Sequence, residues 1–384
     1  MQCNFDDCPD RLESDSLKWH RYDPDVLPMW VADMDFRAPE PVIQALHERV
    51  EHGVFGYGRE PADLRQLIVQ RMERLYGWAV APESIVFLPG VVVGFNLACR
   101  AVTEPGDGVL MQTPLYYPML EVPKNLGLSA NLMELTRLDD GRYEVDWERF
   151  EGAIDERTRV FILCSPQNPV GRVFTRPELE KMAEICLRHG VTICSDEIHC
   201  DIVYEGHPHI PTASIAPEVA DNTITIMAPS KTFNIPGLHC SFAIVTNAEL
   251  RIKFLAARMG LVRGVNVLGF VAGVAAYKYG QPWLDELRTY LTANRDYLVA
   301  FVNTQLPGIT TTAPEGMFLA WLDCRNSRIP GSASEFFLEK SRVAMNEGKA
   351  FGAGGEGFLR FNFGCSRARV QEALERMREA LLTL

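Results

Sequence analysis

Short apolar runs alternate with helical stretches between residues 84 and 245. The apolar runs cover residues 84–88, 109–111, 160–164, 191–195, 223–227 and 240–245. Helical spacing of apolar residues occupies 91–102 and 175–190 between them. The runs are apolar at nearly every position, which is typical of strands buried on both faces. We therefore predict an α/β fold with a mostly parallel sheet flanked by helices.

The pattern changes on either side of this region. Helices are predicted at 39–53 and 62–76, and an amphipathic stretch at 283–306 leads into strand-like runs at 316–322 and 358–363. A chain of 384 residues exceeds the size at which one core usually splits into two. We expect an N-terminal arm (1–38) that joins a smaller α+β domain (281–384), and a large cofactor-binding domain (39–280).

Composition excludes some classes of partner. The formal net charge of −12 disfavours nucleic acid, whose phosphates require a basic face. The ten cysteines form no CxxC pair and most lie in apolar runs, as reduced, buried cysteines do. No apolar run has transmembrane length and the first residues do not resemble a signal peptide. We expect a cytoplasmic protein with neither a membrane nor a nucleic-acid partner.

The chemistry is organised around one lysine. The apolar run from Thr223 breaks at Ala228-Pro229, and Ser230 and Lys231 follow. This pattern predicts a buried strand that ends in a tight loop presenting Lys231. A poorly hydrated lysine loses its proton more easily, and its free amine can form a Schiff base with a carbonyl. Taken alone, the stretch also fits a solvated surface lysine.

Ligands of an open parallel sheet bind beyond the carboxyl ends of its strands. The residues at those predicted ends are Val91, Val92, Tyr116, Tyr117, Asn168, Asp196, His199, Ser230 and Lys231. Together they fit pyridoxal 5'-phosphate. Lys231 supplies the amine for the aldehyde, and Asp196 supplies the carboxylate that keeps the ring nitrogen protonated.

The other residues suit the remaining parts of the same cofactor. Tyr116 offers an aromatic face to the ring. Asn168 and His199 offer hydrogen bonds to the ring hydroxyl. The phosphate suits a helix N-terminus, here the amides of Val91 and Val92, together with the hydroxyl of Ser230.

Eight motifs in order carry a family resemblance. They are residues 27–36 (Leu-Pro-Met-Trp-Val-Ala-Asp-Met-Asp-Phe), 55–57 (Phe-Gly-Tyr), 89–92 (Pro-Gly-Val-Val), 113–118 (Thr-Pro-Leu-Tyr-Tyr-Pro), 168–172 (Asn-Pro-Val-Gly-Arg), 195–199 (Ser-Asp-Glu-Ile-His), 230–234 (Ser-Lys-Thr-Phe-Asn) and 360–365 (Arg-Phe-Asn-Phe-Gly-Cys). The chain resembles fold type I pyridoxal-phosphate enzymes of the class I/II aminotransferase family. Within that family it is most similar to the MalY/PatB-type carbon–sulfur lyases, which include cystathionine β-lyases.

The resemblance implies further roles. Lys231 is expected to carry protons as well as the cofactor, and Arg360 to bind the substrate α-carboxylate with help from the Ala32 amide. Tyr57 is expected to reach the cofactor phosphate of a neighbouring subunit, so the resemblance implies a homodimer with shared sites. Tyr117 is a candidate for assisting the leaving group. The chain departs from the family pattern at 165–167, 235–236 and 317–318, which leaves the amino-acid substrate open.

Three functions remain open at this point. The first is β-elimination of a sulfur-containing amino acid to pyruvate, ammonia and a thiol. The second is an aminotransferase, in which a tyrosine would be the common residue where this chain has His199. The third is a cofactor-binding regulator without activity.

Two other motifs are set aside. Residues 352–357 match GxGxxG but precede a strand-like run, so they are not a dinucleotide fingerprint. His207 and His209 flank a proline with no metal-binding partner nearby, and they are predicted to lie in a solvated loop.

Overall fold

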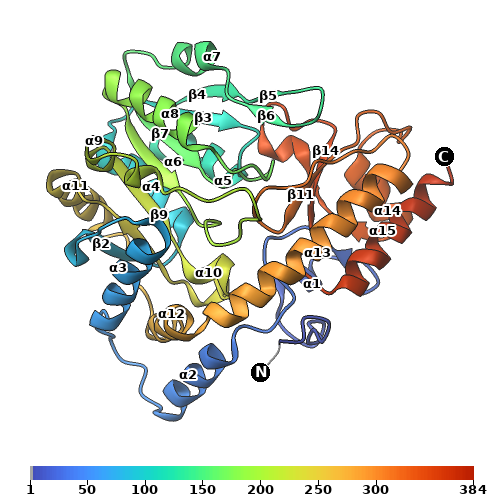
Figure 1. The fold of residues 1–384 in the computed structure, drawn as a ribbon, viewed down its shortest axis with the longest axis horizontal. Coiled ribbons are helices and arrows are strands. Elements are labelled where there is room, and N and C mark those ends of the chain that lie inside the picture. Colours follow the sequence, from blue (N-terminus) through green and yellow to red (C-terminus); the bar gives the residue numbers. More distant parts are fainter. Residues whose placement is uncertain (1–2) are drawn as a thin grey trace.

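A seven-stranded sheet forms the centre of the computed structural model, which describes residues 3–384 (Figure 1). Its strand order is β2-β10-β9-β8-β7-β3-β4. The strands are β2 (Ile85–Leu88), β3 (Gly108–Thr113), β4 (Ser129–Glu134), β7 (Thr158–Cys164), β8 (Thr192–Asp196), β9 (Thr223–Met227) and β10 (Ser241–Ile244). The pairs from β9 to β4 are parallel, whereas β10 is antiparallel to both of its neighbours. The predicted fold class is confirmed.

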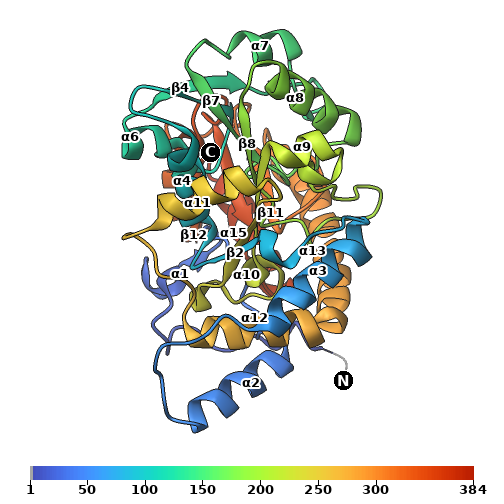
Figure 2. The ribbon, with the colours of Figure 1, turned by 90° about the vertical axis from the view of Figure 1, so that its left-hand side faces the viewer.

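Helices cover both faces of this sheet (Figure 2). Alternate side chains of β7 enter two separate cores: Val160 and Ile162 pack on one face, and Phe161 on the other. The first face is covered by α4 (Val91–Val102) and α11 (Ala248–Arg258), and the second by α8 (Arg176–Arg188). This two-sided burial explains why the strands are apolar throughout.

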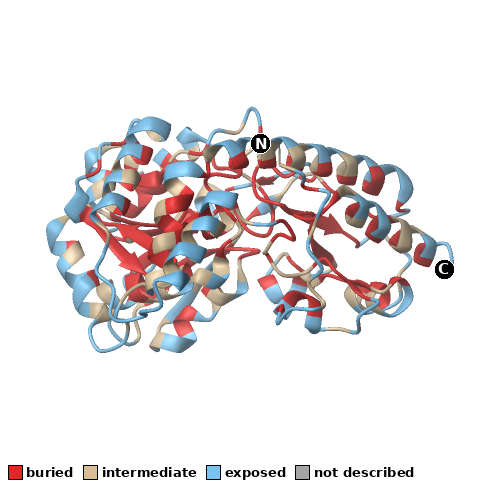
Figure 3. Ribbon diagram, turned by 90° about the horizontal axis from the view of Figure 1, so that it is seen from below, coloured by how far each residue is buried: buried red, intermediate tan, exposed pale blue. Residues whose placement is uncertain are grey.

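The C-terminal part is built on a smaller antiparallel sheet of order β11-β14-β13. Its strands are β11 (Leu319–Asp323), β13 (Asn346–Glu347) and β14 (Phe358–Asn362), and its helices are α13 (Gln281–Gln305), α14 (Ala333–Ser341) and α15 (Arg367–Leu381). Near the N-terminus, β1 (Leu27–Pro28) pairs in parallel with β12 (Val343–Ala344). Figure 3 shows buried strands inside both parts, with exposed outer helix faces.

The remaining elements are short or peripheral. They are α1 (Leu17–His20), α2 (Glu40–Glu51), α3 (Ala62–Tyr76), α5 (Tyr117–Leu120), α6 (Val122–Leu126), α7 (Trp147–Gly152), α9 (Pro217–Asp221), α10 (Pro229–Thr232), α12 (Val267–Tyr279), β5 (Thr136–Arg137) and β6 (Tyr143–Glu144). The sequence pattern did not predict β4, α11 or α12. Helix α12 is apolar around most of its circumference, so no helical stripe marks it.

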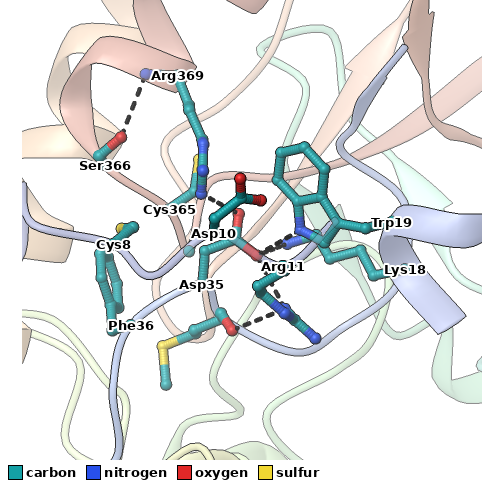
Figure 4. A network of polar contacts seen from close by, with 12 residues as sticks. Cys8, Asp10, Arg11, Lys18, Trp19, Asp35, Phe36, Cys365, Ser366 and Arg369 are labelled. Carbon is teal, nitrogen blue, oxygen red and sulfur yellow. Dashed lines mark hydrogen bonds and ion pairs between the residues drawn. The ribbon is translucent and has the colours of Figure 1, made fainter. Parts of the chain in front are cut away.

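A buried carboxylate anchors the N-terminal segment (Figure 4). Asp35 accepts hydrogen bonds from Arg11 (2.9 Å), Lys18 (3.1 Å), Trp19 (3.1 Å) and Arg369 (3.2 Å). Burial alone would raise the pKa of Asp35, but Lys18, Arg369, Trp19 and Arg11 together hold it below its ordinary value. Because Arg369 belongs to α15, this cluster joins the first 36 residues to the C-terminal part.

Two global expectations can be compared with the described residues. The ten cysteines are all free, and eight of them are buried. Within residues 3–384, no helix is both long and apolar enough to cross a membrane. Residues 1–2 of the predicted N-terminal arm lie outside the described part.

Candidate active site

Lys231 lies in a one-turn helix, α10, and not in the loop that the sequence predicted. Strand β9 ends at Met227, and Pro229 at the first helical position starts the turn. The next residue, Thr232, donates through its hydroxyl to Asp201 (2.8 Å), which also forms a buried ion pair with Arg71 (2.6 Å). These contacts fix the turn that carries Lys231.

The Lys231 amine points at the arm segment, which is defined here as residues 30–36. Its Nζ donates to the carbonyl of Ala32. Burial lowers the pKa of Lys231 to about 8, with Asp33 opposing this shift and Arg360 adding to it. The uncharged amine, the form that a nucleophile or base requires, is therefore far more populated near neutral pH than in an ordinary lysine.

A cavity of about 310 Å³ lies at the carboxyl ends of the strands. Nine of the residues singled out in the sequence line it: Ala32, Val91, Val92, Tyr116, Asn168, Asp196, His199, Ser230 and Lys231. Sequence reasoning missed His239 and Ser241, which also line it. His239 lies in the turn before β10, and Ser241 is the first residue of β10. No sequence pattern distinguishes either residue from ordinary loop residues.

Asp196 is buried in this cavity with few partners. Its side chain accepts one hydrogen bond, from the Ile198 amide at 3.1 Å. Burial raises the pKa of Asp196 to about 7, and Glu197 adds to the rise while Ile198 and Lys231 oppose it. A carboxylate of this kind suits a ligand that brings a positively charged N–H group.

The N-terminus of α4 lies at the same cavity. Gly90 precedes the helix and provides no side-chain cap, so the first amides of Val91 and Val92 remain free to bind an anion. The hydroxyls of Ser230 and Ser241 and the imidazole of His239 line the same cavity. These groups make a site for a phosphate.

Polar side chains surround the space between Asp196 and the N-terminus of α4. His199 is buried, its Nδ1 has no hydrogen-bond partner, and burial together with Lys231 and Arg360 lowers its pKa. Burial raises the pKa of Tyr116 to about 12, so its phenol stays protonated at neutral pH. The rings of Tyr116 and Tyr117 lie 5.2 Å apart.

Arg360 is buried on β14 without a carboxylate partner. Its guanidinium donates to Asn168 Oδ1 (3.0 Å), the Trp30 carbonyl (3.0 Å) and Asn346 Oδ1 (2.7 Å), and it lies over the ring of Phe351. Its Nε has no partner. Burial lowers the pKa of Arg360 to about 10, as expected for a cation that lacks an anion.

These groups fit pyridoxal phosphate. An amine of lowered pKa, a buried carboxylate, a phenol face and a helix N-terminus all line one cavity. The unpartnered Nδ1 of His199 is a buried polar atom that a ring oxygen would satisfy. The described residues contain no group of three His, Cys, Asp or Glu side chains that could hold a metal ion.

Three of the predicted residues do not line the cavity of their own chain: Tyr57, Tyr117 and Arg360, the last of which is bonded to the lining residue Asn168. Tyr57 is 99% exposed in the loop between α2 and α3, next to the exposed Val54 and Phe55. Tyr117 is partly exposed and packs against Tyr116 and Phe351. The chain by itself therefore brings Tyr117 near the cavity and leaves Tyr57 in solvent.

The prediction of a solvated loop was right for His207 and wrong for His209. His207 is half-buried, with 42% of its side chain exposed and Glu315 at 3.7 Å. His209 is 6% exposed, and its Nε2 lies 2.8 Å from the buried carboxylate of Glu197. No sequence pattern indicates this pairing, because the two residues approach each other only when the chain after β8 folds back.

Comparisons with known proteins agree with this geometry. Residues 24–377 match the family model described as aminotransferase class I and II. The chain is 43% identical to cystathionine beta-lyase PatB of Bacillus subtilis, over 98% of this chain and all of that protein. It superimposes on OvoB with a TM-score of 0.95 at 44% identity, covering 100% of both chains. Cystalysin from Treponema denticola, whose structure contains pyridoxal 5'-phosphate, gives a TM-score of 0.95 at 33% identity over 100% of both chains.

Proposed function

The chain belongs to the class I and II aminotransferase family, and we propose that it is a carbon–sulfur β-lyase dependent on pyridoxal phosphate. The reaction converts cystathionine and water into homocysteine, pyruvate and ammonia, and acts on related cysteine thioethers in the same way. One observation carries the proposal: Lys231 and Asp196, each with a shifted pKa, line a single cavity with the free N-terminus of α4. Full-length similarity to a cystathionine beta-lyase supports the choice of reaction.

The chain's own residues would hold the cofactor at five points. Lys231 would bind its aldehyde carbon, and Asp196 its ring nitrogen. Tyr116 would cover one ring face, and the α4 amides with Ser230 would bind the phosphate. Asn168 and His199 would bind the ring hydroxyl.

When bound, the cofactor supplies an electron sink that accepts the electrons of a broken Cα–H bond. Arg360 binds the substrate carboxylate, and its Nη1 and Nη2 exchange their bonds to Asn168 and Trp30 for bonds to the ligand. Lys231 Nζ removes the Cα proton and can return it. Asp196 holds a proton at the ring nitrogen throughout.

The leaving thiolate needs a proton donor. The phenol of Tyr116 keeps its proton at neutral pH, and Tyr117 stands beside it. We assign assistance of the leaving group to Tyr117, because it lies between Tyr116 and Phe351, the residue that packs under Arg360.

A product assay separates the lyase from the aminotransferase. Purified enzyme loaded with pyridoxal phosphate is incubated with cystathionine or cystine, with and without an added keto acid. We expect stoichiometric pyruvate and ammonia over many turnovers without the keto acid, together with the thiol homocysteine from cystathionine or the persulfide thiocysteine from cystine. Activity that stops after one turnover and resumes only with a keto acid would identify an aminotransferase, and no turnover under either condition would favour a regulator.

We also propose a homodimer with shared sites. Tyr57, Val54 and Phe55 form an exposed loop, and Met259 and Leu261 are likewise exposed, an apolar surface that a second copy would cover. Tyr57 then reaches the cofactor phosphate of the other copy. When Lys231→Ala protein is mixed with Tyr57→Phe protein, hybrid sites that combine an intact Lys231 with an intact Tyr57 should bind the cofactor with the affinity of the unchanged protein, whereas a monomer by sedimentation with full activity would rule sharing out.

The proposal places the enzyme in the cytoplasm, a reducing compartment that suits ten free cysteines. Detection of the native protein in a secreted fraction would contradict this location.

A further inference from the structure

Two consecutive carboxylates end strand β8 and point to opposite faces of the sheet. Side chains alternate along a strand, so Asp196 enters the cavity while Ser195 and Glu197 share the other face. The contact between the Ser195 hydroxyl and Glu197 Oε1, at 2.8 Å, follows from this alternation. Glu197 is fully buried, yet no step of the proposed reaction uses it.

Three donors converge on the Glu197 carboxylate. They are the Ser195 hydroxyl (2.8 Å), the Thr212 amide (2.9 Å) and His209 Nε2 (2.8 Å). This pattern of donors stabilises the charged form of a buried carboxylate. The opposite nitrogen of the imidazole, His209 Nδ1, is buried without a partner. The tautomer with its proton on Nε2 therefore donates to Glu197 and leaves no buried N–H unsatisfied.

The pair is enclosed by groups that differ on its two sides. On the side away from the cavity, the ring of Tyr76 of α3 meets the His209 ring edge-on at 5.7 Å, and the other titratable or charged groups are Cys200 and the Asp201–Arg71 pair. On the cavity side, the titratable or charged groups are Asp196, Lys231, His199 and Arg360. The neighbouring cations Arg71 and Lys231 are directed at other partners, Asp201 and Ala32. No lysine or arginine is bonded to Glu197 among the described contacts.

We propose that Glu197, held ionised by His209, is a positioning residue whose charge keeps a proton between Asp196 and the ring nitrogen of the cofactor. This inference rests on the proposed function for its consequence, because only a bound cofactor offers that nitrogen. Its physical basis is independent of the cofactor. A second buried negative charge next to Asp196 makes loss of the shared proton harder. Glu197 is among the groups that raise the pKa of Asp196.

The surface of the same protein offers a matched control. Glu151 and His189 also form a carboxylate–imidazole pair at 2.8 Å, but both side chains are partly exposed, Arg188 also contacts Glu151 at 2.6 Å, and Glu151 lies at the end of α7, away from the cavity. Glu197→Gln removes the buried charge and keeps the size of the side chain. Glu197→Asp keeps the charge, and His209→Gln keeps an N–H donor. Glu151→Gln removes a charge from a pair of the same type.

The test follows two protons by NMR. In cofactor-free protein, the ¹³C shift of the Asp196 carboxyl, assigned with Asp196→Asn, is titrated with pH. In loaded protein, the ¹⁵N shift of a labelled ring nitrogen is titrated in the same way. In Glu197→Gln we expect both transitions to move to lower pH by about one unit or more, which is the usual effect of a nearby charge. Glu197→Asp and His209→Gln should move them less, and Glu151→Gln not at all.

Each result bears on one claim. Transitions in Glu197→Gln that coincide with those of the unchanged protein and of Glu151→Gln would overturn the proposal. If Glu197→Gln does not fold, His209→Leu, which removes the imidazole donor, takes its place. The proposal then requires the same two transitions to shift in His209→Leu. If the Asp196 transition shifts but the protein binds no pyridoxal phosphate, the charge coupling stands and the proposed function fails.

Discussion

Asp35 and Asp196 are both buried aspartates, and their surroundings are opposite. Asp35 is 2% exposed and is bonded to three cationic side chains and an indole N–H. Asp196 is 3% exposed and accepts one backbone amide. The pKa of Asp35 is lowered, and that of Asp196 is raised to about 7. The first cluster is complete within the chain, whereas the second lacks a donor that a ligand would supply.

Lys18 and Lys231 differ in the same way. Lys18 lies 3.1 Å from Asp35 and is 1% exposed on its side chain, so its charge is paired. Lys231 contacts a backbone carbonyl, and its pKa falls to about 8. Paired charges in the Asp35 cluster stabilise the fold, and unpaired ones at the cavity are available for chemistry.

The largest expected effect comes from Lys231→Ala, which should abolish chemistry at the cavity and leave the Asp35 cluster intact. Lys231→Ala should lower pyruvate release by about 10³-fold or more, because it removes both the nucleophile and the base. Borohydride reduction followed by mass spectrometry should find no covalent cofactor in this variant. Lys18→Met is the matched control: it should keep covalent cofactor while the protein becomes less stable. Covalent cofactor retained in Lys231→Ala would show that another lysine binds it.

The next effect is on stability at the Asp35 cluster. Asp35→Asn leaves buried cations without their partner and should lower the free energy of unfolding by about 3–5 kcal/mol. Urea denaturation of cofactor-free protein at pH 7 measures this change. Asp196→Asn should lower the free energy of unfolding much less, since the Asp196 carboxylate has few hydrogen-bond partners to lose. Equal losses for both variants would remove the distinction between the two regions.

Arg360→Lys tests whether Arg360, a buried cation without an anionic partner in the chain, binds the substrate carboxylate. The lysine keeps the charge and loses the two-point grip, so kcat/KM should fall by about 10- to 100-fold, equivalent to about 1.5–3 kcal/mol. Cofactor loading, followed by visible absorption, should be unchanged because Arg360 faces the substrate. An unchanged kcat/KM would refute the assignment.

The pH dependence of stability should separate the two aspartates. A raised pKa, as at Asp196, gives stability that is present below the ordinary value near 3.9 and is lost as the pH rises through about 7. A lowered pKa, as at Asp35, gives stability that is present above that ordinary value and is lost as the pH falls. Between pH 5 and 8, the free energy of unfolding of the cofactor-free protein should fall by roughly 1 kcal/mol or more because of Asp196. Asp196→Asn should abolish this fall. A profile identical to the unchanged protein over this range would contradict the raised pKa.

The smallest expected effect concerns donors supplied by a second copy. Tyr57→Phe removes one hydroxyl from the proposed phosphate contact and should weaken cofactor binding by about fivefold, or about 1 kcal/mol. Equilibrium dialysis of the cofactor measures the change. Tyr279→Phe, which removes a hydroxyl from another exposed tyrosine, is the control and should leave binding unaltered.

The sequence predicted the residues whose position follows from strand order. Lys231 and Asp196 end apolar strands, and parallel strands end at one edge, so their meeting could be foreseen. The direction of β10 could not, because its apolar run is the same in either direction. The helical turn at Lys231 was also missed, since Pro229 fits a turn as well as a first helical position.

Pairings between distant loops were beyond sequence reasoning. Nothing in residues 1–28 distinguishes Arg11 or Lys18 from solvated charges, yet both reach Asp35. Pro208 between His207 and His209, with no cysteine or HExxH nearby, predicts a solvated loop, but the partner of His209 is Glu197, which follows strand β8 and lies 12 residues earlier. Such contacts depend on how loops fold back, which leaves no periodic signal.

The arm segment 30–36 joins both parts of the fold. Asn234, three residues beyond Lys231, holds it through the Met34 amide and carbonyl and the Phe36 carbonyl. Asn362, two residues beyond Arg360, holds it through the carbonyls of Val31 and Asp33. The segment therefore ties the turn that carries Lys231 to the strand that carries Arg360, so a loss of either asparagine would loosen the amine relative to the guanidinium.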